Sequence, residues 1–177
     1  MLICLNVYMI ILGIDPGFER LGIAVLEKNK NERKEKVLFS ECFHTSVKLE
    51  FSERLLLIGK EVKNVIKKFK PDILAIETLF LTTNQKTVMH VAETRGVVIY
   101  EASCNKLEIF EASPPQIKIA ITGYGKANKE QVMKMVKILV DIDNKKTYPN
   151  DHSIGRESDD ELDAIAIALT AFACIKR

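Results

Sequence analysis

The sequence predicts an α/β domain in which a mixed sheet of five strands is flanked by helices. Short apolar runs alternate with longer segments that have helical periodicity. The first three runs are joined by short connections and are expected to be antiparallel neighbours, whereas predicted helices separate the later runs, which are expected to add in parallel. The 177 residues are 47% hydrophobic and 28% charged, which suits a single globular domain with its own core.

The predicted strands are apolar runs bounded by turn residues or charged residues. The first ends at Asp15, directly before the turn residues Pro16 and Gly17. The highly charged segment 28–36 is predicted to be the hairpin loop between the second strand and the third. The five predicted strands are residues 9–15, 21–26, 37–45, 73–76 and 107–112.

The predicted helices carry apolar residues at intervals of three and four, and the first of them ends before Pro71. Its opposite side carries Lys60, Lys63, Lys67 and Lys68, which a solvated face explains more simply than DNA contact does. The polar segment 144–156 is expected to be disordered. The predicted helices are residues 52–69, 87–104, 116–121, 129–140 and 158–175.

Residues 1–8 are predicted to be an N-terminal extension, and residues 9–177 a single domain. Met9, which directly precedes the first apolar run, is an alternative start. The apolar N-terminal stretch lacks a basic segment and a cleavage site and is too short to span a bilayer, so a cytoplasmic protein is expected. The net charge of +2 does not exclude a nucleic-acid partner, because the distribution of charge decides binding.

The cysteines and histidines are scattered along the chain without metal-ligand spacing. Reduced thiols, buried or half-buried, in a cytosolic protein are therefore expected, and a zinc site is not. These residues are Cys4, Cys42, Cys104, Cys174, His44, His90 and His152.

Three acids stand in apolar surroundings. Asp15 and Glu77 end predicted strands, and Asp163 opens a helix whose continuation is apolar on all sides. Each has an ordinary explanation taken alone: a turn, a charged strand end, or a helix N-terminus with the capping-box spacing of Ser158 and Glu161. Together they are harder to explain in that way, because unpaired carboxylates at the edge of a core are costly.

Asp160 and Asp163 are three residues apart and share one helix face. With Asp15 and Glu77 they form a set of four carboxylates without cysteine or histidine, which suits Mg²⁺ or Mn²⁺. Two such ions about 4 Å apart can promote phosphodiester hydrolysis. The acids therefore predict a phosphoryl-transfer enzyme without identifying its substrate.

Five sequence motifs follow one another along the chain. They are Gly13-Ile14-Asp15-Pro16-Gly17 with Gly22-Ile23-Ala24-Val25, Ala75-Ile76-Glu77-Thr78-Leu79-Phe80 with Asn84, Arg95-Gly96, the basic segment from Ile117-Lys118 to Gly123-Tyr124-Gly125-Lys126-Ala127-Asn128-Lys129, and Asp160-Glu161-Leu162-Asp163-Ala164-Ile165-Ala166. In this order they resemble the motifs of the RuvC resolvases, which cut Holliday junctions. The resemblance extends from residue 9 to about residue 171, which is nearly the whole chain.

The resemblance implies an RNase H-like fold and a metal-dependent endonuclease that makes paired nicks in opposed strands of four-way DNA junctions during recombination and repair. It assigns catalysis and metal binding to Asp15, Glu77, Asp160 and Asp163, with two Mg²⁺ ions per subunit and Mn²⁺ as an expected substitute. Asp160 is expected either to complete the metal site or to orient water. The resemblance also implies a homodimer, with helix 87–104 as its expected face, and a branch-migration helicase as a partner.

The residues that the resemblance assigns to DNA binding are Phe80, Lys118, Lys126 and Lys129. Phe80 is expected to stack on an unpaired base, a contact worth roughly 1–3 kcal/mol; the alternative is a half-buried loop anchor. Lys118 and Lys129 match basic positions of the family, and Lys126 adds charge to the same loop. Lysine contacts with phosphates give affinity that falls with salt and carry little sequence information.

Three alternatives remain open. A related nuclease of the YqgF-like kind that acts on RNA would share the four acids, and only Phe80 and the segment 118–129 favour the resolvase. An actin-like kinase or ATPase domain resembles the first motif, but the chain has no second glycine-rich phosphate loop. A non-catalytic junction-binding module would lack at least one acid, and none is missing.

Overall fold

The computed structural model describes residues 8–29, 32–79, 85–141 and 158–175. Phe80, Asn84 and the segment 144–156, which are part of the predictions above, lie outside the described residues. Tyr8 is already part of the first strand, so the strand begins one residue before the predicted boundary of the N-terminal extension.

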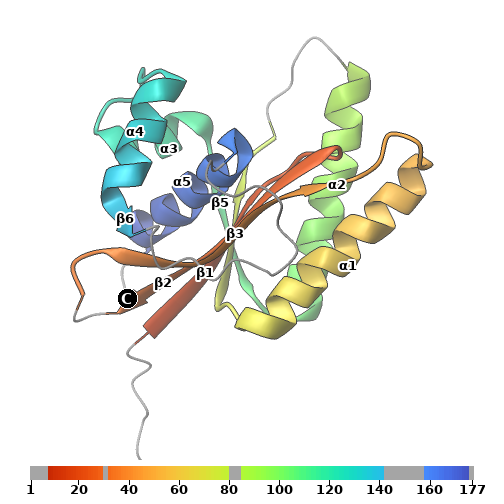
Figure 1. Ribbon diagram of the computed structural model, residues 1–177, viewed down its shortest axis with the longest axis horizontal. Coiled ribbons are helices and arrows are strands. Elements are labelled where there is room, and N and C mark those ends of the chain that lie inside the picture. The colour runs from red at the N-terminus through yellow and green to blue at the C-terminus, as the bar shows by residue number, and fades with distance from the viewer. Residues whose placement is uncertain (1–7, 30–31, 80–84, 142–157, 176–177) are drawn as a thin grey trace, which may run out of the picture.

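The described strands form one mixed sheet in the order β5-β4-β1-β2-β3-β6 (Figure 1). The pairs β1–β2 and β2–β3 are antiparallel, whereas β4 runs parallel to β1, β5 to β4 and β6 to β3. The predicted mixed sheet is confirmed, and the two-residue β6 adds a sixth strand at one edge. The strands are β1 (Tyr8–Asp15), β2 (Arg20–Asn29), β3 (Glu35–His44), β4 (Ile73–Glu77), β5 (Glu108–Ala112) and β6 (Val140–Asp141).

The hairpin between β2 and β3 is more regular than its charged sequence predicts. Strand pairing continues to Glu27 and Lys36, and Lys28 Nζ lies 2.7 Å from Glu35 Oε1. The assignment of 28–36 to a loop is therefore wrong at both ends. The error has a physical reason: opposite charges on facing strands stabilise a ladder that lacks apolar alternation.

The helices agree with the predicted segments, although their ends differ by one or two residues. Helix α3 begins earlier than predicted because Ser113 caps it and Pro114 occupies its first turn, where a proline is tolerated. The helices are α1 (Phe51–Phe69), α2 (Gln85–Cys104), α3 (Pro114–Thr122), α4 (Lys129–Leu139) and α5 (Asp159–Cys174).

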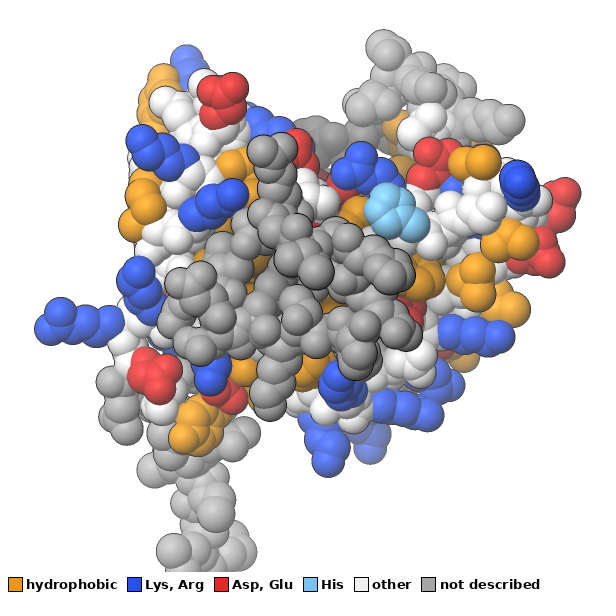
Figure 2. All heavy atoms as spheres, viewed as in Figure 1, with side chains coloured by type: hydrophobic (Ala, Val, Ile, Leu, Met, Phe, Trp, Pro, Cys, Tyr) orange, Lys and Arg blue, Asp and Glu red, His pale blue; other side chains and the backbone are white. Residues whose placement is uncertain are grey.

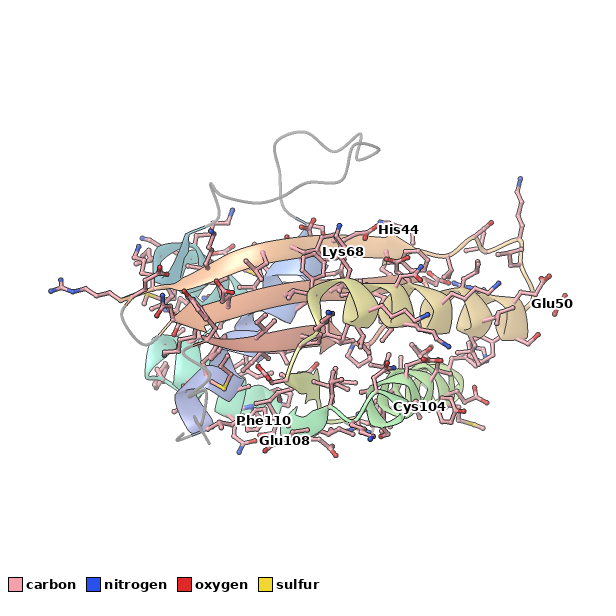
Figure 3. The ribbon with its side chains drawn as sticks, turned by 90° about the horizontal axis from the view of Figure 1, so that it is seen from below. His44, Glu50, Lys68, Cys104, Glu108 and Phe110 are labelled. Carbon is pink, nitrogen blue, oxygen red and sulfur yellow. The ribbon has the colours of Figure 1, made fainter. Side chains whose placement is uncertain are left out.

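The helices cover the two faces of the sheet. Figure 1 shows α1 and α2 on one face and α3, α4 and α5 on the other. Each face has its own core, in which Leu12 and Ile14 of β1 pack toward α1 and α2 while Ile11 packs toward α5. Figure 3 shows α1, which begins after Glu50, beside α2, which ends at Cys104.

Two glycines allow α5 to lie directly on the sheet. A methyl group on Gly13 of β1 would lie 2.3 Å from the Ala164 carbonyl oxygen, and one on Gly22 of β2 would lie 2.2 Å from the Asp160 carbonyl oxygen. Neither position can carry a side chain unless the helix moves. The glycines thus set the height of the first turns of α5 above the ends of β1 and β2.

The outer side of α1 is basic. Its four lysines, predicted to form a solvated face, are all exposed, and Lys67 and Lys68 lie in the last turn, where they complement the helix dipole. Figure 2 shows Lys and Arg side chains gathered over this end of α1. None of the helices in the described part of the chain is long and apolar enough to cross a membrane.

Candidate active site

The ends of two neighbouring parallel strands bring Asp15 and Glu77 together. Asp15 is the last residue of β1 and Glu77 the last of β4, and the preceding residues Ile14 and Ile76 are paired in register. Parallel strands that are paired in register end at the same edge of the sheet, so the two carboxylates are neighbours there. The acids that sequence reasoning singled out in separate segments thus share one sheet edge.

Helix α5 brings a third acid to the same edge. Asp163, in the first turns of α5, lines a cavity of about 250 Å³ together with Asp15 and Glu77. Lys118 of α3 and Lys129 of α4 line the same cavity, and we call it the acidic cavity. Three of the four predicted catalytic residues and two of the predicted DNA-binding lysines therefore meet in one place.

The electrostatics of the acidic cavity favour a cation. Burial raises the pKa of Asp15 most, the negative charges of Asp163, Glu77 and Asp160 add to the effect, and Lys129 opposes it. Together these effects bring the pKa of Asp15 to about 7. Burial also raises the pKa of Glu77, with a further contribution from Asp163. Desolvation and like charges both disfavour the ionised forms, and a bound cation would relieve both.

Lys129 supplies part of the missing positive charge. Its Nζ lies 3.3 Å from Asp163 Oδ2 and 3.2 Å from Asp159 Oδ2. Burial alone would lower the pKa of Lys129, but the charges of Asp163 and Asp159 outweigh it and raise that pKa. Burial likewise raises the pKa of Asp163 despite the opposing effect of Lys129. One lysine therefore does not neutralise the acidic cavity.

The capping interpretation of the acidic motif is also correct. Ser158 Oγ accepts a hydrogen bond from the Glu161 backbone amide, and the Glu161 side chain accepts one from the Ser158 amide. Glu161 is buried and also accepts a hydrogen bond of 2.8 Å from Ser40 Oγ. The capping pair and the Ser40 contact fix the start of α5 on β3, and neither uses the side chain of Asp160 or Asp163.

Asp160 lies differently from the other three predicted catalytic acids. Among the described residues, those that line the acidic cavity include Asp15, Glu77 and Asp163 but not Asp160. The Asp160 carboxylate is ion-paired with Arg20, and Cys42 Sγ donates to it at 3.4 Å. Its charge still acts on Asp15 and Asp163, whose pKa values it raises.

Arg95 and Thr78 surround Glu77 in ways that sequence reasoning missed. Arg95 Nε of α2 donates to the Glu77 carbonyl oxygen at 3.1 Å, and its guanidinium pairs with Glu111 of β5. Arg95 therefore ties the end of β4 to α2 and β5. Thr78 lines a second hollow of about 240 Å³ beside Asp15 and Glu77, and its Oγ1 is a buried group of the described region without a hydrogen-bond partner. The sequence signals for these residues were the Arg95-Gly96 motif and the motif in which Thr78 follows Glu77, and neither showed these contacts.

The donors in the acidic cavity fit a hard divalent cation. They are carboxylate oxygens that carry unbalanced negative charge, and Mg²⁺ and Mn²⁺ prefer such ligands. In the described part of the chain, no three acidic, histidine or cysteine side chains are already grouped closely enough to enclose one ion.

The remaining candidates lie outside this cavity. Lys126 is exposed in the loop between α3 and α4. Cys42 is a half-buried free thiol, whereas Cys104 and Cys174 are exposed, so the expectation that the cysteines are buried or half-buried is wrong for these two.

An RNase H-like sheet with acids at the ends of β1 and β4 and at the start of α5 defines a divalent-metal-dependent nuclease. The family model described as crossover junction endodeoxyribonuclease RuvC matches residues 11–171. The chain belongs to this family of metal-dependent nucleases and is an endodeoxyribonuclease.

Individual relatives support the same family assignment. The RuvC of Halothermothrix orenii is 40% identical over 161 residues, which cover 91% of this chain and 90% of the relative. The RuvC of Thermosipho melanesiensis is 41% identical over 164 residues, which cover 90% and 94%. The structure of T. thermophilus RuvC in complex with a Holliday junction substrate superposes with a TM-score of 0.78 at 30% identity, covering 93% of each chain. Membership in this nuclease family decides against the kinase alternative.

Proposed function

We propose that this protein is a Holliday junction resolvase that makes paired nicks in opposed strands of four-way DNA junctions. The observation that carries the proposal is the meeting of Asp15, Glu77 and Asp163 with Lys118 and Lys129 in one cavity. Membership in the family supports the substrate, as does the 30% identity to a RuvC that was solved with a Holliday junction substrate.

The proposed catalytic set is Asp15, Glu77, Asp160 and Asp163. Asp15, Glu77 and Asp163 would hold two Mg²⁺ ions per subunit, with Mn²⁺ as a substitute, and Asp160 would complete the site or orient water. When bound, the cations supply the charge that activates water and stabilises the leaving oxygen. The protein supplies oxygen ligands at the rigid ends of two strands and a helix, which keeps the ligand geometry defined.

Lysines of α3, of α4 and of the loop between them would bind the DNA backbone. Lys118 and Lys129 line the acidic cavity and can attract the scissile phosphate, whereas exposed Lys126 would contact a phosphate farther away. Lys129 would have to exchange its partner Asp163 for phosphate when DNA and metal bind. The proposed stacking of Phe80 on an unpaired base stays a prediction.

A homodimer would place one active site on each of two opposed strands, which matches the two-fold symmetry of a junction. Helix α2 is the proposed interface. Its exposed side carries Met89 and Tyr100, each 64% exposed and three helical turns apart, with the exposed Gly96 between them. Nothing lies within 4 Å of a methyl group on Gly96, so a second helix could approach closely there. The branch-migration helicase partner and the cytoplasmic location stay predictions.

The deciding experiment compares a labelled synthetic four-way junction with a matched linear duplex, in Mg²⁺ or in EDTA, using the wild type and Asp15→Asn. We expect paired nicks in opposed strands only on the junction, only with Mg²⁺ and only from the wild type. Products that a DNA ligase seals would establish 5′-phosphate and 3′-hydroxyl ends. Cleavage of RNA without cleavage of the junction would overturn the proposal in favour of the YqgF-like alternative.

A further inference from the structure

Asp160 is held on the β2–β3 side of the acidic cavity by two side chains. Its carboxylate is ion-paired with Arg20, the first residue of β2, and Cys42 Sγ of β3 donates to the same oxygen at 3.4 Å. Asp15, Glu77 and Asp163 line the acidic cavity, whereas Asp160 is not among the described residues that line it.

The register of the sheet explains why these two side chains meet Asp160. Gly22 is paired with Cys42 across β2 and β3, and Arg20 lies two residues before Gly22 on the same face of β2. Gly22 has no side chain, and a methyl group there would lie 2.2 Å from the Asp160 carbonyl oxygen. The first turn of α5 thus rests over Gly22, between Arg20 on one side and Cys42 on the other.

The contact with Arg20 is accessible and therefore easily exchanged. The Arg20 side chain is 52% exposed and the Asp160 side chain 21% exposed. Ion pairs at such positions are typically worth about 0–1 kcal/mol, because water replaces the partner at little cost. Asp160 is also close to the acidic cavity: a methyl group on Gly22 would lie 2.2 Å from the Asp160 carbonyl oxygen and 3.1 Å from Asp15 Cβ, and the charge of Asp160 raises the pKa of Asp15 and of Asp163.

We propose that Arg20 is a positioning residue that holds Asp160 away from the acidic cavity in the metal-free enzyme and releases it when a divalent cation enters. Arg20 and the cation then compete for one carboxylate. The inference rests on the proposed metal site, and it deepens that site by assigning a task to a residue outside the predicted catalytic set. It is consistent with the described structure, in which no three acids are grouped closely enough to enclose an ion.

The test measures Mn²⁺ binding to the DNA-free protein by isothermal titration calorimetry. The variants are Arg20→Gln, Asp160→Asn and the double variant, with Arg33→Gln as a control that removes the same charge from an exposed residue of the β2–β3 hairpin. We expect Arg20→Gln to bind Mn²⁺ roughly two- to fivefold more tightly, the range that corresponds to the loss of one weak exposed ion pair. Arg33→Gln should bind like the wild type.

The double variant separates competition for Asp160 from a general effect of charge. If Arg20 acts through Asp160, Arg20→Gln has no effect in the Asp160→Asn background. An equal gain in both backgrounds, or no gain in either, would overturn the proposal. Arg20→Lys, which keeps the charge on a folded chain, should bind between the wild type and Arg20→Gln. Failure of the wild type to bind Mn²⁺ would count against the metal site itself, whereas normal wild-type binding without a gain in Arg20→Gln counts against the role of Arg20 alone.

Discussion

Lys129 Nζ of α4 lies 3.3 Å from the Asp163 carboxylate of α5, within the cavity that also holds Asp15 and Glu77. The active-site acids thus have a cation of their own before any metal or DNA arrives. Because Lys129 was predicted from the family resemblance to meet the DNA backbone, its position links the metal site with phosphate binding. The Lys129 ammonium group cannot pair with Asp163 and bind a DNA phosphate equally well at the same time.

Replacing Lys129 should show its effect on the pKa values of the neighbouring acids. In Lys129→Gln, the pKa values of Asp15 and Asp163 should rise, because Lys129 lowers both. The acid limb of the cleavage rate against pH should therefore move to higher pH, and the rate at neutral pH should fall. Lys129→Arg keeps the charge and should restore the position of the limb. An unchanged pH profile in Lys129→Gln would show that Lys129 does not act on these acids.

Asp15 should make the metal-free protein less stable as the pH rises. Its pKa is raised from 3.8 to about 7 in the folded state, so the folded chain binds an extra proton between these values. The stabilising contribution is fully present below pH 4 and is lost as the pH rises through 7. Asp15→Asn cannot ionise and should lack this dependence. Between pH 5 and pH 8 the wild type should lose roughly 2–3 kcal/mol of unfolding free energy relative to Asp15→Asn.

Urea unfolding in EDTA across this pH range measures the difference between the two proteins. Glu32→Gln, a change at an exposed residue of the hairpin, is the control and should follow the wild type. Adding Mg²⁺ should raise the wild-type stability more at pH 8 than at pH 5, because protons compete with the metal for Asp15. Parallel curves for the wild type and Asp15→Asn would contradict the raised pKa.

The sequence was sufficient to predict the strands and helices, and the acids at their ends, because these features depend on local residue patterns. Apolar runs that end in Asp15 and Glu77 marked two buried strands, and the paired register of β1 and β4 makes those ends neighbours. The pairing of Asp160 with Arg20 and the hydrogen bond from Arg95 to the Glu77 carbonyl oxygen could not be predicted in this way. Both join side chains that the tertiary fold brings together, and neither has a periodic or capping signal in the chain.

The close approach of α5 to β2 predicts a strong effect at Gly22. A methyl group there would lie 2.2 Å from the Asp160 carbonyl oxygen and 3.1 Å from Asp15 Cβ, so Gly22→Ala must displace the helix or the strand. We expect a loss of roughly 1–3 kcal/mol in unfolding free energy, as for an overpacked core, together with loss of cleavage. In the control Gly125→Ala, the methyl group meets only the exposed side chain of Ile119, which can move. Equal stability of the two variants in urea would refute the tight packing.

The loop lysine and the cavity lysine should differ in how they affect DNA. Lys126 is exposed and separate from the residues that line the acidic cavity, whereas Lys118 lines that cavity. Lys126→Ala should weaken junction binding and reduce the slope of log affinity against log salt by about one, with little change in the cleavage rate of bound junction. Lys118→Ala should lower the cleavage rate of bound junction. Salt-dependent binding in Ca²⁺ and single-turnover cleavage in Mg²⁺ separate the two effects. If Lys118→Ala mainly weakened binding and Lys126→Ala mainly slowed cleavage, the assigned roles of the two lysines would be wrong.

The exposed side of α2 gives the last prediction, which concerns assembly. Met89 and Tyr100 are each 64% exposed and three turns apart on one side of the helix. If α2 forms the interface, Tyr100→Glu places a charge in it on each subunit and should convert the dimer into monomers in sedimentation velocity at micromolar concentration. Leu56→Glu changes a residue of α1 that is 58% exposed and should leave the dimer intact.

A wild type that sediments as a monomer would exclude the dimer, whereas a dimer that persists in Tyr100→Glu would place the interface on another surface. Each monomer would still hold a complete set of acids, since all four come from one chain, so Tyr100→Glu should bind Mn²⁺ like the wild type. Its nicks should then fall on single strands without pairing, because the second cut of a junction requires a second active site held in symmetric register.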